Sequence, residues 1–244
     1  MRDRRLRWPI DAKIERAVRG RLVRGVDRRA KYLLIGFDAG TLIVHLGMSG
    51  SLRIVSAQTP PRPHDHWDLT TDTGKVLRFH DPRRFGSLHW TSGDPLEHPL
   101  LAKLGPEPLS EDFDAEYLYR ATRKRSVAIK QLLMNSHVVV GVGNIYANEA
   151  LFRARIAPRR AAGRLTRAQA QALVHAVKSV LAEAIEIGGT TLRDYVDASG
   201  SPGYFKQKLF VYERAKQPCR VCKTPIKQFA QGQRSTYWCA NCQR

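Results

Sequence analysis

Four cysteines near the end of the chain constrain its fold more than any other feature of the sequence. Cys219 and Cys222 form one C-x2-C pair, Cys239 and Cys242 form a second, and sixteen residues separate the two pairs. Two such pairs supply the four thiolates of a tetrahedral zinc site, with a hairpin between them. Because four thiolates leave no coordination position open for water, we expect one structural Zn²⁺. A redox pair would need only one C-x-x-C beside a thioredoxin-like βαβ unit, which the sequence lacks.

The segment between the two cysteine pairs is basic. KTPIKQFAQGQRSTYW contains Lys223, Lys227 and Arg234 and no acidic side chain. Arg234 follows Gly232, where a hairpin turn would place its guanidinium at the tip, within reach of a phosphate. An ordinary exposed arginine fits the same spacing, so the pattern alone leaves both interpretations open.

The whole chain is strongly basic, with 41 Lys and Arg against 22 Asp and Glu and a formal net charge of +19. Such an excess favours a polyanionic partner, with nucleic acid ahead of an acidic membrane surface, over a merely solvated basic face. No apolar run approaches the roughly 20 residues that span a bilayer. The basic start MRDRRLRWPI is not followed by the apolar stretch of a signal peptide. We therefore expect a cytoplasmic protein, where a reducing environment disfavours disulfides.

The first part of the chain has the pattern of β-strands. Residues 21–92 contain short β-rich runs separated by turn signals, including a hairpin that turns at 72–74, and a short helix over 10–18 precedes them. Several short strands at this spacing predict a β-sandwich or barrel.

The pattern becomes helical after a proline-punctuated connector that begins at about residue 95. Helices are predicted over 126–134, 144–154 and 166–187, and a capping-box pair marks the start of the last one. Together with the cysteine module, these changes place domains at 1–94, 95–208 and 209–244.

Two glycines, Gly141 and Gly143 in VVVGVGNIYANEA, precede the second of these helices, as glycines do in phosphate-binding turns. The third glycine of a dinucleotide fingerprint would fall at Tyr146, so the motif is a weak cofactor signal.

Several motifs in a fixed order make the sequence similar to one family along essentially its whole length. They are LGMSGSLRI, HDPRRFG, LGPEPL, VVGVGNIYANEALF, GGTTLRDYV, GSPGYF and the closing C-x2-C-x16-C-x2-CQR. Together they resemble the formamidopyrimidine-DNA glycosylase family of bifunctional bacterial enzymes for oxidised purines. The resemblance implies an α+β multidomain fold with an N-terminal β-sandwich, a helix–two-turn–helix domain and a C-terminal four-cysteine zinc finger. It also implies removal of 8-oxoguanine and formamidopyrimidines from duplex DNA, with β,δ-elimination at the abasic site.

The resemblance assigns roles to single residues. Lys31 resembles the lysine near the scissile phosphates that acts as general acid in β-elimination. Arg234 resembles the zinc-finger arginine that grips phosphate and is credited with δ-elimination. Met48, Arg83 and Phe85 resemble the trio that fills the gap left by the everted base, a task that suits an apolar wedge with a guanidinium. Without the resemblance, Lys31 would be an ordinary exposed lysine, and Met48 and Phe85 would be core residues.

The other predicted DNA contacts are His64, Arg125, Lys130 and Asn144. His64 and Arg125 resemble DNA-contacting positions, and Lys130 resembles a lysine close to the lesion. Asn144 resembles the helix–two-turn–helix asparagine that binds a backbone phosphate, so the glycine turn before it serves DNA rather than a dinucleotide. The implied partner is double-stranded DNA with oxidised purines or abasic sites, bound by a monomer associated with the bacterial nucleoid.

The start of the sequence departs from the family's pattern. The family's nucleophile is the secondary amine of an N-terminal proline followed by glutamate, whereas this sequence begins Met1-Arg2-Asp3. Schiff-base chemistry needs an amine that attacks C1′ of the sugar. We expect a mis-set start or a truncation rather than an inactive damage-binding protein, because Lys31 and Arg234 are both in place.

Three other functions remain as alternatives. They are an inactive binder of damaged DNA, an oxidised-pyrimidine glycosylase similar to endonuclease VIII, and an RNA-binding zinc-ribbon protein. DPRRFG and VVGVGNIYANEA favour the purine branch, while Ser201 in GSPGYF bears on base selectivity.

Overall fold

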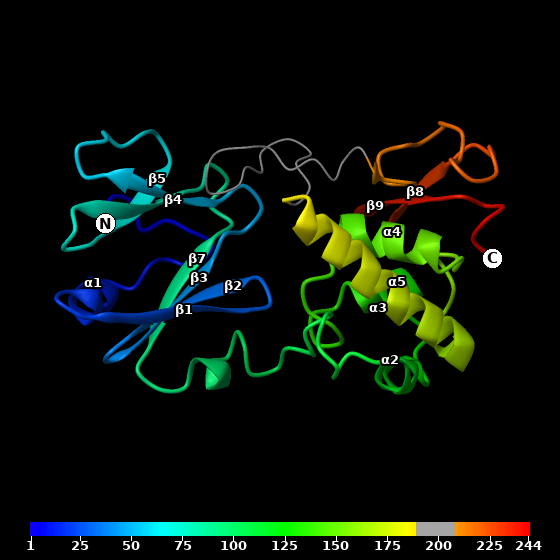
Figure 1. The fold of residues 1–244 in the computed structure, drawn as a ribbon, viewed down its shortest axis with the longest axis horizontal. Coiled ribbons are helices and arrows are strands. Elements are labelled where there is room, and N and C mark those ends of the chain that lie inside the picture. The colour runs from blue at the N-terminus through cyan, green and yellow to red at the C-terminus, as the bar shows by residue number, and fades with distance from the viewer. Residues whose placement is uncertain (189–207) are drawn as a thin grey trace. The chain divides into compact units, whose positions relative to one another are not determined.

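The computed structural model describes residues 1–188 and 208–244. They form two compact units, one of residues 1–102 and one that joins residues 103–188 to 208–244 (Figure 1). Ser201 and the GSPGYF motif lie outside the described residues.

The first unit is built from two antiparallel sheets. Its elements are α1 (Lys13–Val18), β1 (Val23–Arg29), β2 (Tyr32–Phe37), β3 (Gly40–His45), β4 (Ser51–Ser56), β5 (Asp65–Thr70), β6 (Lys75–His80), β7 (Ser87–Thr91) and the short 3₁₀ helix η1 (Pro95–Glu97). One sheet has the order β1-β2-β3-β7 and the other the order β4-β6-β5. The hairpin predicted to turn at 72–74 joins β5 to β6, where Gly74 has a φ of 74°.

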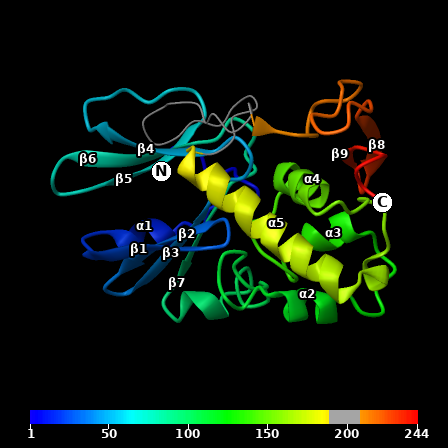
Figure 2. The ribbon, with the colours of Figure 1, turned by 45° about the vertical axis from the view of Figure 1, so that its right-hand side comes forward.

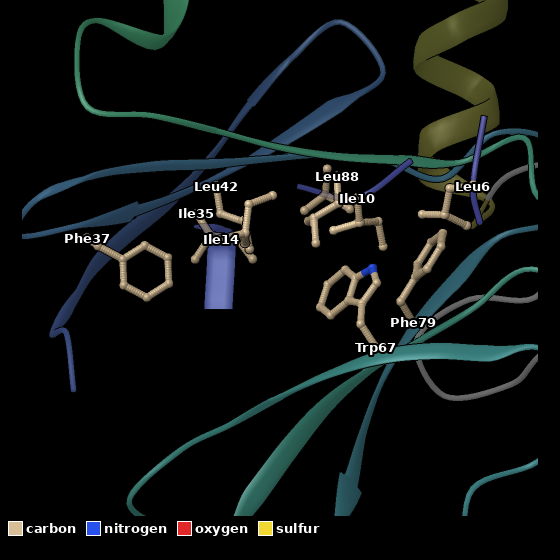
Figure 3. Close-up of a cluster of buried hydrophobic side chains, with 10 residues drawn as sticks. Leu6, Ile10, Ile14, Ile35, Phe37, Leu42, Trp67, Phe79 and Leu88 are labelled. Carbon is tan, nitrogen blue, oxygen red and sulfur yellow. The ribbon is translucent and has the colours of Figure 1, made fainter. Parts of the chain in front are cut away.

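The two sheets enclose one apolar core, as expected for a sandwich. Trp67 and Phe79 from the three-stranded sheet point toward Ile10 and Leu88 (Figure 3). The rings of Trp67 and Phe79 stack on each other with their centroids 5.4 Å apart. Alternate residues of β2 and β3, such as Ile35 and Phe37 or Leu42 and Val44, face this core because side chains on a strand point to opposite faces in turn, whereas β1 is exposed. Leu6 and Ile10 join the core from the segment before α1, so the first residues of the chain pack against the sandwich.

The second unit begins with a group of helices. They are α2 (Ala115–Thr122), α3 (Ile129–Leu133), α4 (Asn144–Arg153), the short 3₁₀ helix η2 (Ala162–Arg164) and α5 (Arg167–Glu186). The long helix α5 packs against α2 and α4 (Figure 2). Within the described ranges, no helix combines the length and the apolar character needed to cross a bilayer.

The predicted capping box at the start of α5 is confirmed. The Thr166 hydroxyl accepts the Gln169 N–H and the Gln169 side chain accepts the Thr166 N–H, both at 3.2 Å. Ile185 keeps the apolar helical spacing that predicts a core position, but it is 67% exposed in the last turn of this helix.

Helix α3 is shorter than the predicted helix over 126–134. The residues before it pair with a distant segment, because Ala162 donates its N–H to the Val127 carbonyl at 2.9 Å and Ala128 bridges Ala161. This pairing keeps the chain extended up to Ala128, so the helix starts at Ile129.

The second unit ends in the cysteine module. Strands β8 (Lys227–Gln231) and β9 (Arg234–Trp238) form the hairpin predicted between the cysteine pairs. Gly232 and Gln233 connect them. Their φ values, 55° at Gly232 and 59° at Gln233, are both positive, which identifies a type I′ turn.

Candidate nucleic-acid interface

Two loops of the first unit present the predicted wedge residues. Met48 lies after β3, and Arg83 and Phe85 lie between β6 and β7. The Met48 and Phe85 side chains are 69% and 44% exposed, which excludes the core interpretation of these apolar residues. The Arg83 guanidinium carbon lies 4.8 Å from the centroid of the Phe85 ring, as in a cation–π pair.

The two loops touch through their backbones. A Cβ on Gly47, whose φ is 72°, would lie 2.6 Å from the Gly86 nitrogen and from the Phe85 carbonyl carbon. A Cβ on Gly86 would lie 2.5 Å from the Phe79 ring. Glycine is therefore required at both positions, and this close approach brings Met48 and Phe85 to the same place on the surface.

One buried carboxylate holds both loops, and the sequence analysis did not identify it as a functional residue. Asp81 is fully buried and accepts hydrogen bonds from the Ser49 hydroxyl at 2.9 Å, the Gly86 N–H at 2.7 Å and the Arg83 N–H at 3.3 Å. Ser49 belongs to the Met48 loop and the other two donors to the Phe85 loop. Its only signal in the sequence is an acidic residue before the proline of a loop, a pattern typical of a turn.

The structure places Lys31 and His64 on exposed turns of the same unit. Lys31 lies in the turn between β1 and β2, next to Ala30 with a φ of 54°. Burial, and after it the charge of Lys31, lowers the pKa of His45. His64 has a φ of 71°, and its carbonyl accepts the Asp81 N–H at 3.0 Å, so it adjoins the base of the Phe85 loop.

Arg234 and Arg125 are exposed cations of the second unit. Arg234 is the first residue of β9, directly after the type I′ turn, so the hairpin presents it at its tip as predicted. Arg125 follows α2, where its carbonyl accepts the Gly163 N–H at 2.8 Å.

Lys130 and Asn144 are engaged within the protein. Lys130 is 1% exposed, and its amine donates to the Ser235 carbonyl at 3.1 Å and to the Thr236 hydroxyl at 2.7 Å. The Asn144 amide donates to the same Ser235 carbonyl at 3.1 Å. Burial, together with the charge of Arg234, lowers the pKa of Lys130 to about 8. Both predicted DNA contacts thus hold the strand that begins with Arg234, and direct contact with DNA stays a prediction.

Helix α4 provides two further anchors that the sequence analysis missed. The Asn148 side chain accepts the Tyr237 N–H at 2.7 Å. Glu149, almost fully buried, accepts the N–H groups of Phe210, Val211 and Tyr212 at 2.8 to 2.9 Å. Burial raises the pKa of Glu149, while the three N–H groups oppose that shift. These residues fix the hairpin and the segment leading into it to the helix that starts at Asn144.

The four cysteines have the geometry of a metal site. Their sulfur atoms all lie within 4.8 Å of one another, with 3.4 Å between Cys222 and Cys239 and 4.0 Å between Cys219 and Cys242. Four thiolates about 2.3 Å from a common ion have comparable separations, so the group can bind one zinc ion. In the described part of the chain it is the only such cluster of three or more metal-ligating side chains.

Family comparisons match all parts of this architecture. Residues 1–88 match the formamidopyrimidine-DNA glycosylase N-terminal domain, residues 104–196 its H2TH domain, and residues 216–244 the zinc finger found in FPG and IleRS. These matches define a DNA glycosylase of the helix–two-turn–helix class.

Relatives along the full chain define the family. The formamidopyrimidine-DNA glycosylase of Thioalkalivibrio sulfidiphilus is 60% identical over 100% of this chain and 90% of its own. The crystal structure of Lactococcus lactis Fpg with DNA containing an abasic site has a TM-score of 0.91 at 32% identity, covering 100% of this chain and 90% of that one. A structure of MutM with DNA containing carbocyclic 8-oxo-G has a TM-score of 0.90 at 31% identity, covering 99% and 88%. The chain belongs to the formamidopyrimidine-DNA glycosylase family, and these matches favour none of the three alternative functions.

Proposed function

We propose that this chain, with the family's N-terminal Pro-Glu opening in place, is a DNA glycosylase with AP-lyase activity that removes formamidopyrimidines and 8-oxoguanine from duplex DNA. The observation that carries the proposal is the exposed wedge of Met48, Arg83 and Phe85, held by Asp81, in a chain 60% identical to a formamidopyrimidine-DNA glycosylase. An apolar wedge with a guanidinium suits an enzyme that extrudes a nucleotide, because the unpaired base and the vacated stack both need a substitute partner.

The wedge and the basic residues have separate tasks in this reaction. Met48 and Phe85 fill the stack, and Arg83 donates to the orphaned base, while Lys31 acts as general acid in β-elimination. His64 and Arg125 contact the DNA backbone. Their exposure in the structure suits these roles.

Arg234 binds a phosphate of the cleaved strand and promotes δ-elimination. Lys130 and Asn144 support it through the Ser235 carbonyl, which both side chains bind. In this proposal they act on the DNA mainly by fixing the hairpin, and the zinc ion fixes the hairpin from its other end.

The biological setting follows from the same chemistry. We place the enzyme in the bacterial cytoplasm as a monomer associated with the nucleoid, on duplex DNA with oxidised purines or abasic sites. Its functional division is the one predicted above, at residues 1–94, 95–208 and 209–244.

Borohydride trapping tests the reaction directly. The family's nucleophile is an N-terminal proline amine, so two polypeptides are compared on an 8-oxoguanine duplex: the 244-residue chain, and the same chain preceded by a segment that starts Pro-Glu. The amine attacks C1′, the damaged base leaves, and the sugar ring opens to a Schiff base that borohydride reduces to a stable adduct. We expect an adduct only with the extended polypeptide.

Two controls make the result decisive. A thymine glycol duplex should trap much less protein than the 8-oxoguanine duplex, and equal trapping would favour a pyrimidine glycosylase. If the extended polypeptide binds the duplex and forms no adduct, the proposed activity is wrong.

A further inference from the structure

A basic pocket that no prediction above includes lies beside the wedge in the first unit. Its volume is about 380 Å³, and it is lined among others by Ser49, Ser51, Arg53, Arg62, His80 and Arg83. No carboxylate of the described chain lines it. Two of these residues also belong to the wedge region, because Ser49 follows Met48 in the chain and Arg83 contacts the Phe85 ring.

A second buried carboxylate, that of Asp65, holds the side chains and backbone that line this pocket. The Asp65 side chain is fully buried, and its oxygens lie 3.0 Å from Nδ1 of His80 and 3.6 Å from Nη2 of Arg53. It also accepts the backbone N–H of Arg62 at 2.7 Å. One anion thus fixes three members of the pocket lining without entering the pocket.

The charge of Asp65 does not neutralise the pocket. Arg78 also lies 3.8 Å from Asp65, although its main partner is Asp68 at 2.9 Å. The one carboxylate is therefore shared among Arg53, Arg78 and His80. The lining keeps an excess of positive charge in a fixed arrangement.

Several donors of the pocket lack acceptors among the described residues. Nε of Arg53 is buried and has no hydrogen-bond partner there. In the same part of the chain, the guanidinium of Arg62 makes no hydrogen bond or ion pair, and the guanidinium of Arg83 contacts only the Phe85 ring. A buried donor without an acceptor costs about 1–3 kcal/mol, so an anion with several acceptor oxygens would be bound favourably here.

We propose that this pocket binds a phosphate group, and specifically a backbone phosphodiester of the duplex next to the void that the wedge fills. Planar guanidinium groups bind phosphate oxygens in pairs, and serine hydroxyls supply the smaller donors. A phosphate seated between Ser49 and Arg83 fixes the duplex at the base of both wedge loops. The DNA partner rests on the proposed function, whereas the affinity of the pocket for phosphate does not.

Arg62→Gln is the main test because it removes a cation without breaking any ion pair of the described structure. The full chain is bound to a duplex with a stable abasic analogue, and affinity is measured by fluorescence anisotropy over a range of salt concentrations. We expect Arg62→Gln to weaken binding about tenfold and to reduce the slope of log K against log salt by about 0.9. Arg24→Gln, an exposed arginine of β1 outside the pocket, is the matched control.

Neutral methylphosphonates placed one at a time along both strands then locate the phosphate. At one position near the lesion, the substitution should weaken binding by the wild-type chain and have no further effect on Arg62→Gln. Arg53→Gln should show the same coupling, with thermal unfolding as its folding control. Equal effects of Arg62→Gln and Arg24→Gln, with no coupled position, would overturn the proposal.

Inorganic phosphate distinguishes the two sources of the group. At constant ionic strength we expect it to displace DNA only weakly, since a free ion lacks the duplex that delivers the phosphodiester. If phosphate alone shifts the pocket's NMR signals at submillimolar concentration and no methylphosphonate position couples, the pocket serves a free anion and the DNA assignment is wrong. Binding requires no chemistry, so loss of trapping with intact coupling would count against the proposed function alone.

Discussion

The wedge loops and the zinc-held hairpin both present exposed arginines on tight turns. A buried anion supports the wedge loops, whereas a buried cation supports the hairpin. Asp81 only accepts hydrogen bonds, and it gathers N–H and O–H donors from two loops. Lys130 only donates, and it binds a carbonyl and a hydroxyl of one strand. The charge of the buried group therefore follows from which backbone groups the turn directs inward.

The two regions also differ in how many groups stabilise each of them. Three donors converge on the Asp81 carboxylate, and no other acceptor is present for them in the described structure. The Ser235 carbonyl, in contrast, has donors from both Lys130 and Asn144, and the cysteine cluster fixes the far end of the hairpin. We expect the wedge to depend on a single residue, and the hairpin to depend on its metal more than on any one side chain.

Zinc removal should have the largest effect and should act on one region only. The cysteines form much of the core of the module together with Phe152, Val211, Ile226 and Tyr237, so chelation removes the constraint that keeps this small core assembled. Structural zinc contributes on the order of 10 kcal/mol to such modules. We expect loss of the hairpin's NMR dispersion and at least about 100-fold weaker DNA binding, both restored by added Zn²⁺.

The first unit is the internal control for that experiment. Signals of Trp67 and its neighbours in the sandwich should stay unchanged on chelation. Unfolding of both units together would show that the supports are not independent.

Asp81→Asn should destabilise the wedge by about 2–3 kcal/mol, because the amide places a donor against the Gly86 N–H. Ser49→Ala removes one of the three donors and should cost only about 1 kcal/mol. Urea unfolding followed by tryptophan fluorescence measures both. Equal costs for the two variants would contradict the central role of the carboxylate.

The same pair of variants has a readout that a merely structural role would not move. Asp81→Asn should reduce the preference for duplexes with an abasic analogue over undamaged duplexes, since the wedge residues no longer share one position. Ser49→Ala should retain most of that preference.

The buried cation predicts a pH dependence for the hairpin. The pKa of Lys130 is lowered to about 8 from an ordinary value of 10.5, so between these values the unfolded chain binds more protons than the folded one. Stability relative to Lys130→Met should therefore rise with pH, by up to about 3 kcal/mol between pH 7 and pH 10.5. A relative stability that falls over this range would exclude a buried lysine.

Arg234→Gln tests the second cause of this shift. Removing the neighbouring cation should raise the pKa of Lys130, measured by NMR of its side chain. An unchanged value would leave burial as the whole cause.

Asn144→Ala should have the smallest effect, about 1 kcal/mol, because Lys130 still donates to the Ser235 carbonyl. In the Lys130→Met background the same change leaves that carbonyl without either donor and should cost about twice as much. Urea unfolding of the four proteins in this double-mutant cycle measures the difference. Additive costs would show that the two donors do not share an acceptor in solution.

The sequence was sufficient to predict the fold wherever neighbouring residues determine the local structure. Short β-rich runs between turn signals predicted the strands, and a Thr–Gln pair predicted the start of α5. Regular cysteine spacing predicted the zinc module, and a glycine predicted the turn that presents Arg234. Each of these signals is contained within a few neighbouring residues or a fixed repeat.

Contacts between distant segments could not be predicted in the same way. Helix α3 starts late because residues near Val127 pair with residues near Ala161, and α2 begins at an unpredicted cap where Asp114 accepts the Tyr117 N–H. Lys130 looked like a cation for DNA because nothing near it in the sequence shows that β9 covers it. The roles of Asp81 and Glu149 were not predicted for the same reason: Asp81 joins its own loop to the distant Ser49, and all three donors to Glu149 come from residues 210–212.

The close approach of Gly47 and Gly86 has a practical consequence for altering the specificity of the wedge. The contact between the two loops requires glycine at positions 47 and 86, while the side chains that would meet the DNA, Met48, Arg83 and Phe85, are exposed. These three side chains can therefore be varied without changing the contact between the loops. A library that randomises Met48, Arg83 and Phe85 and keeps both glycines would sample new base preferences on an unchanged scaffold.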